Sequence, residues 1–235
     1  MQIKFYKKIE KNMNRLEFIK KGLGSLGFLA VMPLMGACKK DSTTGTSSTD
    51  CVVTNSETAG PYPTKSPSSF VTKNIVSDRT GTALTVQITV RNVKNNCAFL
   101  KDAIVDIWHC DAAGAYSEYG NLTSVHFLRG RQTTDANGMA AFTSIYPSWY
   151  SGRAPHIHVH VYNSSGTSLL VTQIAFPEDI SKVVYAQGVY ASRGQADTKN
   201  ASDGIFSDGV SNELATLTGS PSAGYVLTHI INVNA

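Results

Sequence analysis

Apolar and polar residues alternate with a period of two along several short segments of this chain. Residues 84–90 read LTVQITV, in which every second side chain is apolar, and residues 139–145 and 168–176 are rich in apolar and β-branched residues. Successive side chains of a strand point to opposite faces, so this alternation predicts strands with one buried face. We expect further strands at 103–108, 127–133, 156–162 and 224–234, and one short helix near 180–185.

Turn-forming residues separate these segments, as in DANG at residues 135–138 and NSSG at 163–166. Seven or eight short, mainly antiparallel strands at a spacing of about ten residues predict an all-β sandwich with long loops around its active site. We expect the last strand to form a hairpin or the sheet edge that closes the domain. Residues 58–67 contain three prolines and are expected to form an arm outside the sheets.

The first forty residues differ from the rest in charge. The chain has 21 Lys/Arg and 17 Asp/Glu. Residues 1–40 hold nine Lys/Arg and two Asp/Glu, so the remainder holds 12 Lys/Arg and 15 Asp/Glu and has a net charge of −3. The basic excess therefore does not indicate nucleic-acid binding, and we expect no nucleic-acid partner. A basic region precedes an uncharged, mostly apolar run, 22–37, which predicts an export signal over residues 1–37.

The signal ends in LMGAC, which resembles a bacterial lipobox whose cysteine, here Cys38, is lipidated. This predicts an exported lipoprotein with a Ser/Thr-rich tether over 38–50 and a folded domain over 51–235, in the periplasm or at the cell surface. The lipid anchor would be its sole membrane contact. An uncleaved N-terminal anchor is the alternative, Met13 could be the true start instead of Met1, and the membrane that holds the anchor is left open.

Three cysteines remain besides Cys38, namely Cys51, Cys97 and Cys110. Export makes disulfides permissible, and an odd number favours one bridge and one free thiol. The sequence does not fix the pairing.

Histidines alternate with apolar residues in one stretch, YPSWYSGRAPHIHVHVY at residues 146–162. His156, His158 and His160 share one face of the predicted strand, with Ile157 and Val159 on the other. Imidazole is a good ligand for Zn, Cu, Fe and Ni, so the pattern favours a metal site over a row of solvent-facing histidines.

Two tyrosines lie near this stretch in ways that could complete a metal site. Tyr150 precedes His156 by six residues across a Ser-Gly turn, and Tyr116 lies in a glycine-containing loop after a strand. Either tyrosine alone is more simply a core residue. A phenol titrates near ~10 and becomes a ligand only beside a strongly Lewis-acidic cation. Two tyrosines with two histidines would therefore indicate Fe(III) rather than zinc.

Four motifs carry a family resemblance that runs from about Cys51 to the C-terminus. They are ETAGPYP at 57–63, VDIWHCDAAGAYS at 105–117, FLRGRQTTDANG at 127–138 and YPSWYSGRAPHIH at 146–158. With them the chain resembles the intradiol ring-cleavage dioxygenases, the family of protocatechuate 3,4-dioxygenase and catechol 1,2-dioxygenase, and above all its small, exported, single-domain members.

The resemblance implies an oxidoreductase with one non-haem Fe(III) per chain. This enzyme would use O2 to cleave a catechol-type ring between its two hydroxyl-bearing carbons, giving a muconate-type diacid. Its partners would be a small aromatic diol and O2. Which catechol is the substrate, and whether the protein is a homo-oligomer, are left open.

The resemblance also implies roles for individual residues. The metal ligands would be Tyr116, Tyr150, His156 and His158. Arg153, Tyr150 and Gln173 would be catalytic, with Arg153 beside the substrate and Gln173 behind it. Gly60, Pro61, Tyr62, Trp149 and Arg153 would contact the substrate, although Trp149 could instead be a core residue.

His160 departs from the family pattern. We expect it to lie behind the ligands or to face solvent, because it stands about 6–7 Å beyond His158 along the strand. Two other functions remain alternatives: an exported β-sandwich module that binds aromatic or carbohydrate ligands without catalysis, and a zinc or copper enzyme built on all three histidines.

Overall fold

The computed structural model describes residues 51–235. The predicted export signal over 1–37, the lipidation site Cys38 and the tether over 38–50 lie outside the described residues. Within the described part, no helix is long and apolar enough to cross a membrane.

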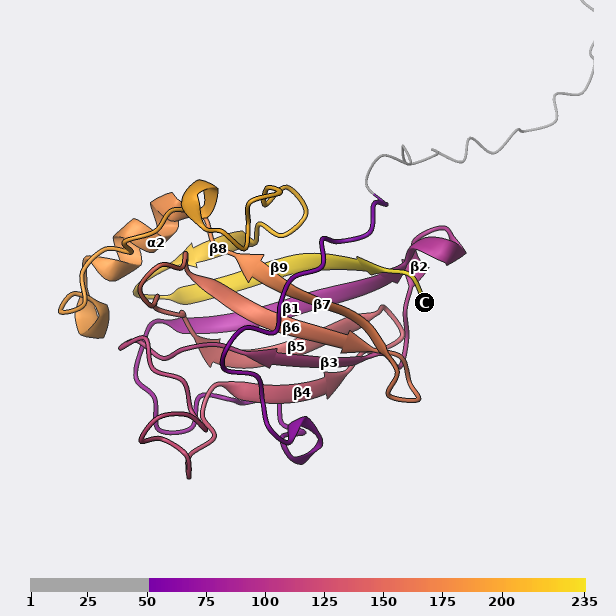
Figure 1. Ribbon diagram of the computed structural model, residues 1–235, viewed down its shortest axis with the longest axis horizontal. Coiled ribbons are helices and arrows are strands. Elements are labelled where there is room, and N and C mark those ends of the chain that lie inside the picture. Colours follow the sequence, from indigo (N-terminus) through magenta and orange to yellow (C-terminus); the bar gives the residue numbers. More distant parts are fainter. Residues whose placement is uncertain (1–50) are drawn as a thin grey trace, which may run out of the picture. The chain divides into compact units, whose positions relative to one another are not determined.

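Two β-sheets pack against each other as a sandwich (Figure 1). The first has the order β2 (Ala98–Phe99), β1 (Ala83–Asn92), β9 (Gly224–Val233) and β8 (Thr216–Ser220), with β5 (Met139–Ile145) paired to β1. The second has the order β4 (Arg129–Thr133), β3 (Ile104–Trp108), β6 (His156–Tyr162) and β7 (Ser168–Ala175). Helix α2 (Glu178–Tyr185) follows β7, and short 3₁₀ turns lie at Pro67–Ser69, Val93–Asn95, Gly188–Tyr190 and Asn200–Ser202. The predicted all-β sandwich is confirmed.

The core lies between the sheets and is filled by the apolar residues of the period-two pattern. In β1 the buried residues are Leu84, Val86, Ile88 and Val90. They belong to one continuous cluster with side chains of the second sheet, among them Val105, Ile107, Ile157, Val159 and Ile174. The inward face of β6 is thus apolar, which leaves its histidines on the outer face of the second sheet.

The position of the last strand confirms the predicted hairpin and excludes the alternative of a sheet edge. β9 pairs with β8 in an antiparallel hairpin, but it lies between β8 and β1 and runs parallel to β1. Its hairpin partner β8 was not predicted, since TLTGS contains a single apolar residue and a glycine. The parallel pairing joins residues about 140 positions apart, from Leu84 with Tyr225 to Asn92 with Val233, and no local pattern encodes such a contact.

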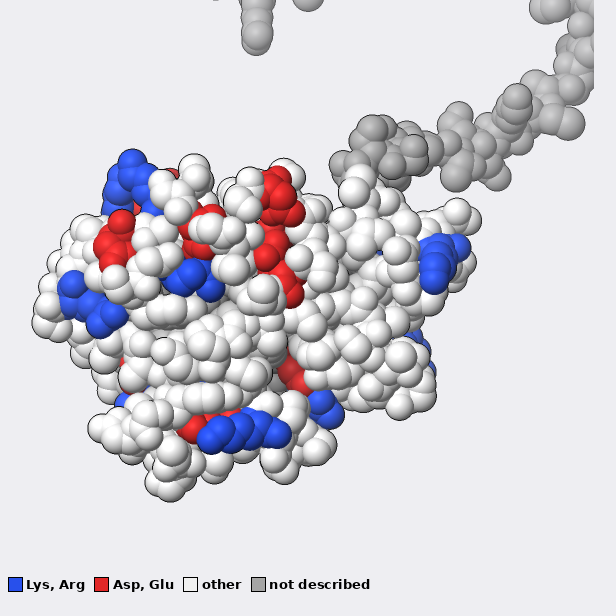
Figure 2. All heavy atoms as spheres, viewed as in Figure 1, with Lys and Arg blue, Asp and Glu red and all other residues white. Residues whose placement is uncertain are grey.

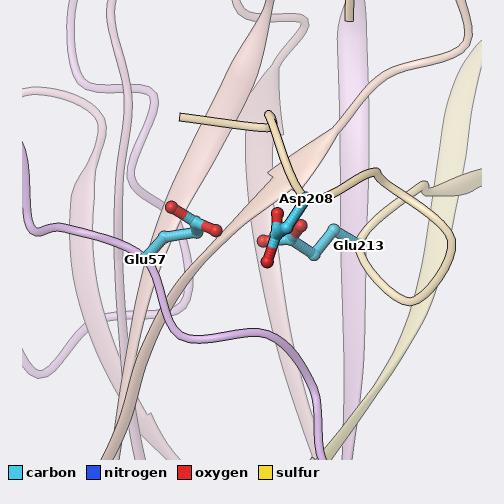
Figure 3. Close-up of side chains that lie close together, drawn as sticks. All are labelled: Glu57, Asp208 and Glu213. Atoms are coloured by element: carbon cyan, nitrogen blue, oxygen red, sulfur yellow. The ribbon is translucent and has the colours of Figure 1, made fainter. Parts of the chain in front are cut away.

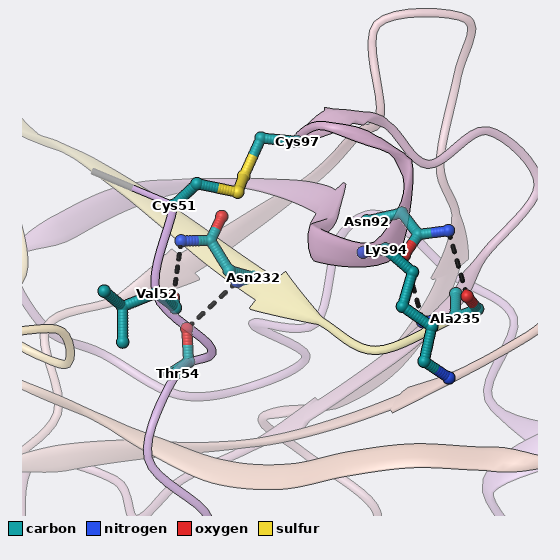
Figure 4. Close-up of a disulfide and its surroundings, with 8 residues drawn as sticks. All are labelled: Cys51, Val52, Thr54, Asn92, Lys94, Cys97, Asn232 and Ala235. Carbon is teal, nitrogen blue, oxygen red and sulfur yellow. Dashed lines mark hydrogen bonds between the residues drawn. A yellow bond between two sulfur atoms is a disulfide. The ribbon is translucent and has the colours of Figure 1, made fainter. Parts of the chain in front are cut away.

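A disulfide between Cys51 and Cys97 attaches the start of the domain to the turn after β1 (Figure 4). Beside it, Thr54 N–H donates to the Asn232 carbonyl at 3.0 Å, and Asn232 N–H donates to Thr54 Oγ1 at 3.0 Å. Cys110 is free and buried, and burial raises the pKa of its thiol to about 12. The expectation of one bridge and one free thiol is confirmed.

The disulfide closes a long loop, so its removal should lower stability measurably. With a sequence separation of 46 residues, the chain-entropy relation gives about 4 kcal/mol at 25 °C. We expect the double variant Cys51→Ser, Cys97→Ser to lose about 2–4 kcal/mol of unfolding free energy, measured by denaturant titration. Unchanged stability would show that the N-terminal arm is held without the bridge.

Candidate metal centre

Strand register places a row of polar and aromatic side chains across the outer face of the second sheet. His158 of β6 lies directly opposite Gln173 of β7 and Trp108 of β3, and Trp108 lies opposite Arg129 of β4. Directly opposed residues of antiparallel strands project to the same face, so all four side chains lie on one surface. The Trp108 and His158 rings stack with a 5.0 Å separation of centroids and an interplanar angle of 2°.

Two of the three histidines on this face, His156 and His158, each turn one nitrogen toward a common point. His156 Nε2 and His158 Nε2 are 3.1 Å apart. The Ala154 carbonyl lies 2.6 Å from His156 Nδ1, and a carbonyl can only accept a hydrogen bond. Nδ1 of His156 therefore carries the proton, and its Nε2 presents a lone pair.

Tyr116 reaches the same point from the loop that follows β3. Its hydroxyl is 3.5 Å from His156 Nε2. The loop is shaped by Asp111, whose Oδ1 accepts from the backbone N–H groups of Ala113 and Ala115, and by Gly114 with φ of +80°. The structure therefore brings together two imidazole nitrogens and a phenol oxygen from segments forty residues apart.

Tyr150 lies on the open side of this group. A turn closed by Arg153 N–H donating to the Tyr150 carbonyl, 3.1 Å, folds the tyrosine back over β6, as the Ser-Gly sequence predicted. Its ring centroid is 5.6 Å from that of His156 and 5.8 Å from that of Tyr116. Tyr116 is buried, whereas Tyr150 is half-buried and so nearer to an incoming ligand.

Burial keeps all four groups neutral in the absence of a bound cation. It lowers the pKa of His156 to about 3, with Arg153 adding repulsion, and it lowers the pKa of His158 further, with a contribution from His156. Burial also raises the pKa of both phenols, far above the usual value for Tyr116, while Arg153 opposes the shift at Tyr150. The imidazoles can therefore bind a metal without losing a proton, whereas each phenol must lose one.

The geometry fits a single metal ion. Ligand atoms about 2.0–2.1 Å from a metal and at right angles to each other are about 2.9 Å apart. The observed separations of 3.1 Å between the imidazole nitrogens and 3.5 Å to the Tyr116 oxygen are close to this value. Two phenols and two imidazoles suit a trivalent cation better than a soft one, since phenolate is a hard, charged donor.

Arg153 is held in place beside this group by three side chains. Its Nε donates to both carboxylate oxygens of Asp203, at 2.9 and 2.8 Å, its Nη1 donates to Tyr150 Oη at 3.2 Å, and its Nη2 donates to Gln173 Oε1 at 2.5 Å. Gln173 Nε2 in turn donates to the Thr58 carbonyl at 2.9 Å. Arg153 thus links the tyrosine, the sheet and the N-terminal arm.

The N-terminal arm covers His158 and Tyr116. Gly60 has φ of +66°, and a Cβ added to it would lie 2.8 Å from His158 Cε1. Tyr62 stacks on Tyr116 with centroids 4.6 Å apart and packs edge-on against Tyr150 at 5.9 Å. Glycine is required here both by the left-handed backbone and by the close approach to the imidazole.

Arg129 joins this arm to the loop that carries Tyr116. It is buried, and its guanidinium donates to the carbonyls of Tyr62 at 3.0 Å and Ser117 at 2.6 Å. Glu118 pairs with it at 3.2 Å. Arg129 lies within the motif at 127–138, but nothing in the sequence indicates this role.

Other predicted site residues lie around this group. Pro61 is exposed on the arm. Trp149 is half-buried, and its indole packs under the Arg193 guanidinium and donates to the Gly194 carbonyl at 3.2 Å. His160 has both ring nitrogens engaged, with Ser168 Oγ and Tyr162 Oη at 2.8 Å each. These contacts match the expectation that His160 is not directed at the metal.

Two residues that shape the centre were not predicted to do so. Asp203 lies in the polar loop beyond α2, fifty residues from the arginine it holds, and no spacing in the sequence connects them. The other residue is Trp108, which is buried and stacks on the His158 ring on the outer face of the sheet. The strand register alone identifies its role, because Trp108 and His158 are directly paired.

Comparison with known proteins places this centre in a family context. Residues 60–201, more than half of the chain, match a family model described as "Dioxygenase". The protocatechuate 3,4-dioxygenase beta chain of Burkholderia cepacia is 30% identical over 121 residues, which cover 46% of this chain and 52% of that protein. The chain therefore spans about half the length of this relative.

Solved structures of similar proteins cover most of the chain. An intradiol ring-cleavage dioxygenase from Tetranychus urticae has a TM-score of 0.71 and 28% identity, over 78% of this chain and 95% of that one. The dioxygenase domain of a dioxygenase–carbohydrate-binding fusion from Streptomyces sp. SirexAA-E has a TM-score of 0.60 and 25% identity, over 78% and 99%.

Replacement of Gly60 by alanine tests the close approach of the arm to His158. The left-handed backbone costs a residue with a Cβ about 1–2 kcal/mol, and the contact with the imidazole adds about 1–3 kcal/mol of overpacking. We expect Gly60→Ala to lower the unfolding free energy by at least about 1 kcal/mol more than Gly166→Ala. Gly166 is the matched control, because its φ is +85° but nothing lies within 4 Å of an added Cβ. Equal losses would contradict the packing of Gly60 on the ring.

Proposed function

This chain belongs to the intradiol ring-cleavage dioxygenase family, and from this membership we propose that it is a non-haem Fe(III) enzyme. It would use O2 to cleave a catechol-type ring between its two hydroxyl-bearing carbons and release a muconate-type diacid. The observation that carries the proposal is the convergence of His156 Nε2, His158 Nε2 and Tyr116 Oη beside Tyr150 and Arg153.

The donor set supports Fe(III) as the metal, with one ion per chain held by Tyr116, Tyr150, His156 and His158. Buried phenols with raised pKa values ionise only next to a strong Lewis acid. When bound, Fe(III) would supply that Lewis acidity and draw electron density from a coordinated aromatic diol, which prepares its ring for reaction with O2.

Tyr150 is suited to accept a proton from the substrate. It is half-buried, and its oxygen already accepts a hydrogen bond from Arg153 Nη1 at 3.2 Å. As a phenolate it is a strong base relative to a catechol hydroxyl, and the arginine keeps the oxygen in place while the proton transfers to Oη. Tyr116 is buried under Tyr62 and has no comparable freedom.

Arg153 is suited to stabilise negative charge that develops on the substrate. Its guanidinium is permanently charged, and Asp203 and Gln173 fix its plane before any ligand arrives. A preorganised charge of this kind costs no reorganisation during the reaction. Gly60, Pro61 and Tyr62 on the arm would form a second wall of the substrate site. Trp149, whose indole packs against Arg193, would be a further contact.

The Cys51–Cys97 disulfide supports an exported protein, because such bridges persist in oxidising compartments. We infer a lipid-anchored enzyme attached at Cys38, with its domain in the periplasm or at the cell surface. A substrate at that location would be a small phenolic diol that reaches the enzyme from outside the cytoplasm.

Neither alternative function accounts for the arrangement as well. A non-catalytic binding module has no use for two neutral imidazoles and a phenol that converge on one point, with a second phenol beside them. A zinc or copper site on all three histidines is disfavoured, because both ring nitrogens of His160 already contact Tyr162 and Ser168.

Loading with iron and oxygen uptake test the proposal directly. We expect the iron-loaded full chain to be red to burgundy from phenolate-to-Fe(III) charge transfer and to consume O2 with at least one member of a catechol panel, giving ring-opened diacids by mass. Tyr150→Phe should shift the visible band and slow turnover. His160→Ala is the matched control and should keep both the colour and the iron content.

Two outcomes would contradict the proposal. One is a colourless protein that holds stoichiometric iron. The other is elemental analysis that finds zinc or copper, with the metal lost in His160→Ala.

The Asp203 carboxylate gives a separate prediction about positioning. Asp203→Asn should leave the arginine charged but loosen its orientation, and we expect kcat/KM to fall roughly 10–100-fold with the iron content unchanged. Asp197→Asn is the control, since Asp197 lies in the same loop and accepts from the Gly152 backbone and the Thr198 hydroxyl, whereas the ion pair of Arg153 is with Asp203. A fall of the same size in both variants would mean that the loop, and not the ion pair, is responsible.

A further inference from the structure

Three carboxylates gather at a point distinct from the histidines and tyrosines. Glu57 comes from the N-terminal arm, and Asp208 and Glu213 come from the segment before β8 (Figure 3). One carboxylate oxygen of each lies within 4.8 Å of the others. Figure 2 shows a run of acidic side chains from this segment down to where the arm crosses, with no basic side chain between them.

Glu213 is the unusual member of this cluster. It is fully buried, with an exposed fraction of 0%. Its Oε1 accepts from Thr172 Oγ1 at 3.2 Å, but its Oε2 is buried and has no hydrogen-bond partner among residues 51–235. A buried carboxylate oxygen left without a partner is costly, so it points to a ligand at this position.

No basic side chain of the described domain neutralises the cluster by an ion pair. Arg153 is the cation whose field reaches Glu57, and it is already engaged by Asp203, Tyr150 and Gln173. Burial, with repulsion from Glu57, raises the pKa of Glu213 to about 8. The three carboxylates therefore lie close together without a paired cation to offset the repulsion between them.

The backbone holds these carboxylates in place. Glu57 N–H donates to the Val171 carbonyl of β7 at 2.8 Å, and Ala175 N–H donates to the Glu213 carbonyl at 2.9 Å. Asp208 Oδ2 accepts from Asn55 Nδ2 at 2.9 Å, which leaves Oδ1 available. Hydrogen bonds thus anchor each of the three acidic residues to β7 or to the arm. The fold therefore holds their carboxylates close together, and the cluster does not depend on mobile side chains.

We propose that Glu57, Asp208 and Glu213 form a Ca²⁺ site, separate from the histidine and tyrosine centre. Oxygen-only donors suit a hard cation. Calcium–oxygen distances of about 2.3–2.6 Å place opposite ligands about 4.6–5.2 Å apart, whereas magnesium allows about 4.0–4.2 Å. The three oxygens lie within 4.8 Å of one another, which is close enough to share one ion. Calcium suits them better than magnesium, because it accepts carboxylates in an irregular shell, whereas magnesium demands near-ideal octahedral geometry and keeps most of its water. Water would complete the shell on the exposed side of Asp208.

The site would join the two segments that flank Arg153. Thr58, next to Glu57, accepts from Gln173 Nε2, and Asp203, in the same loop as Asp208, holds Arg153. An ion bound to Glu57 and to Asp208 would therefore tie the arm to this loop. The site is a stabilising clamp of the domain and does not depend on the reaction catalysed at the neighbouring centre.

Calorimetric titration of the chelator-treated full chain with CaCl₂ tests the site, with MgCl₂ in parallel. We expect one Ca²⁺ per chain with a Kd of about 10⁻⁴–10⁻³ M, typical of extracellular modules, weaker Mg²⁺ binding, and a Tm that rises with Ca²⁺ concentration. Asp208→Asn should weaken Ca²⁺ binding at least ten-fold, and Glu213→Gln should abolish it. Asp102→Asn is the control, because Asp102 is an exposed acid paired with Lys101 outside the cluster.

Glu213→Gln without calcium should be at least as stable as the unmodified protein, since it replaces a buried acid that is costly to ionise with a neutral amide and keeps the Thr172 contact. If it fails to fold, the exposed Asp208→Asn variant decides the matter. No saturable binding, or equal affinity in Asp208→Asn and Asp102→Asn, would overturn the proposal. Tyr150→Phe should bind Ca²⁺ unchanged, so failure of the iron assignment would be distinguishable from failure of this one.

Discussion

Antiparallel pairing of β6 with β3 and β7 is the constraint on which the centre depends. It directs the apolar residues of β6 into the core and sets Gln173, His158, Trp108 and Arg129 side by side on the other face. A slip of one residue would turn every histidine into the core, at a cost far greater than any single contact at the centre. The register is thus secured by the hydrophobic pattern, and the imidazole geometry follows from it.

Arg153 connects parts of the chain that no strand pairing joins. It reaches Asp203 beyond α2, Gln173 on β7 and Tyr150 on the preceding turn, and through Gln173 it reaches Thr58 on the arm. Because each partner restrains a different segment, the position of the guanidinium depends on the whole rim of the centre. A change in any of these segments would displace the guanidinium before it disturbed the sheets, because the sheets are stabilised by the core between them.

The strands and the proximity of the histidines to Tyr150 could be predicted, because both follow from local spacing. Leu84 to Val90 alternates with period two, and the Ser151-Gly152 turn returns Tyr150 to the strand. The parallel pairing of β9 with β1 and the Arg153–Asp203 pair could not, since each joins residues that the sequence separates by fifty positions or more. The role of Glu213 could not be predicted from the sequence. An isolated glutamate in a loop is expected to be a solvent-exposed charge, and only the structure shows that this one is buried.

Charge balance explains how a guanidinium can lie next to the proposed metal ligands. An unpaired arginine there would repel a cation, and in this chain it already contributes to the depressed pKa of His156. Asp203, buried and bonded to the guanidinium through both oxygens, turns the arginine into a nearly neutral pair. Nη1 and Nη2 of Arg153 remain directed at Tyr150 and Gln173. The arginine therefore keeps its hydrogen-bond donors, while Asp203 reduces its net electric field. The aspartate would thereby reconcile the two roles proposed for this small volume, a cation site and a donor for developing negative charge.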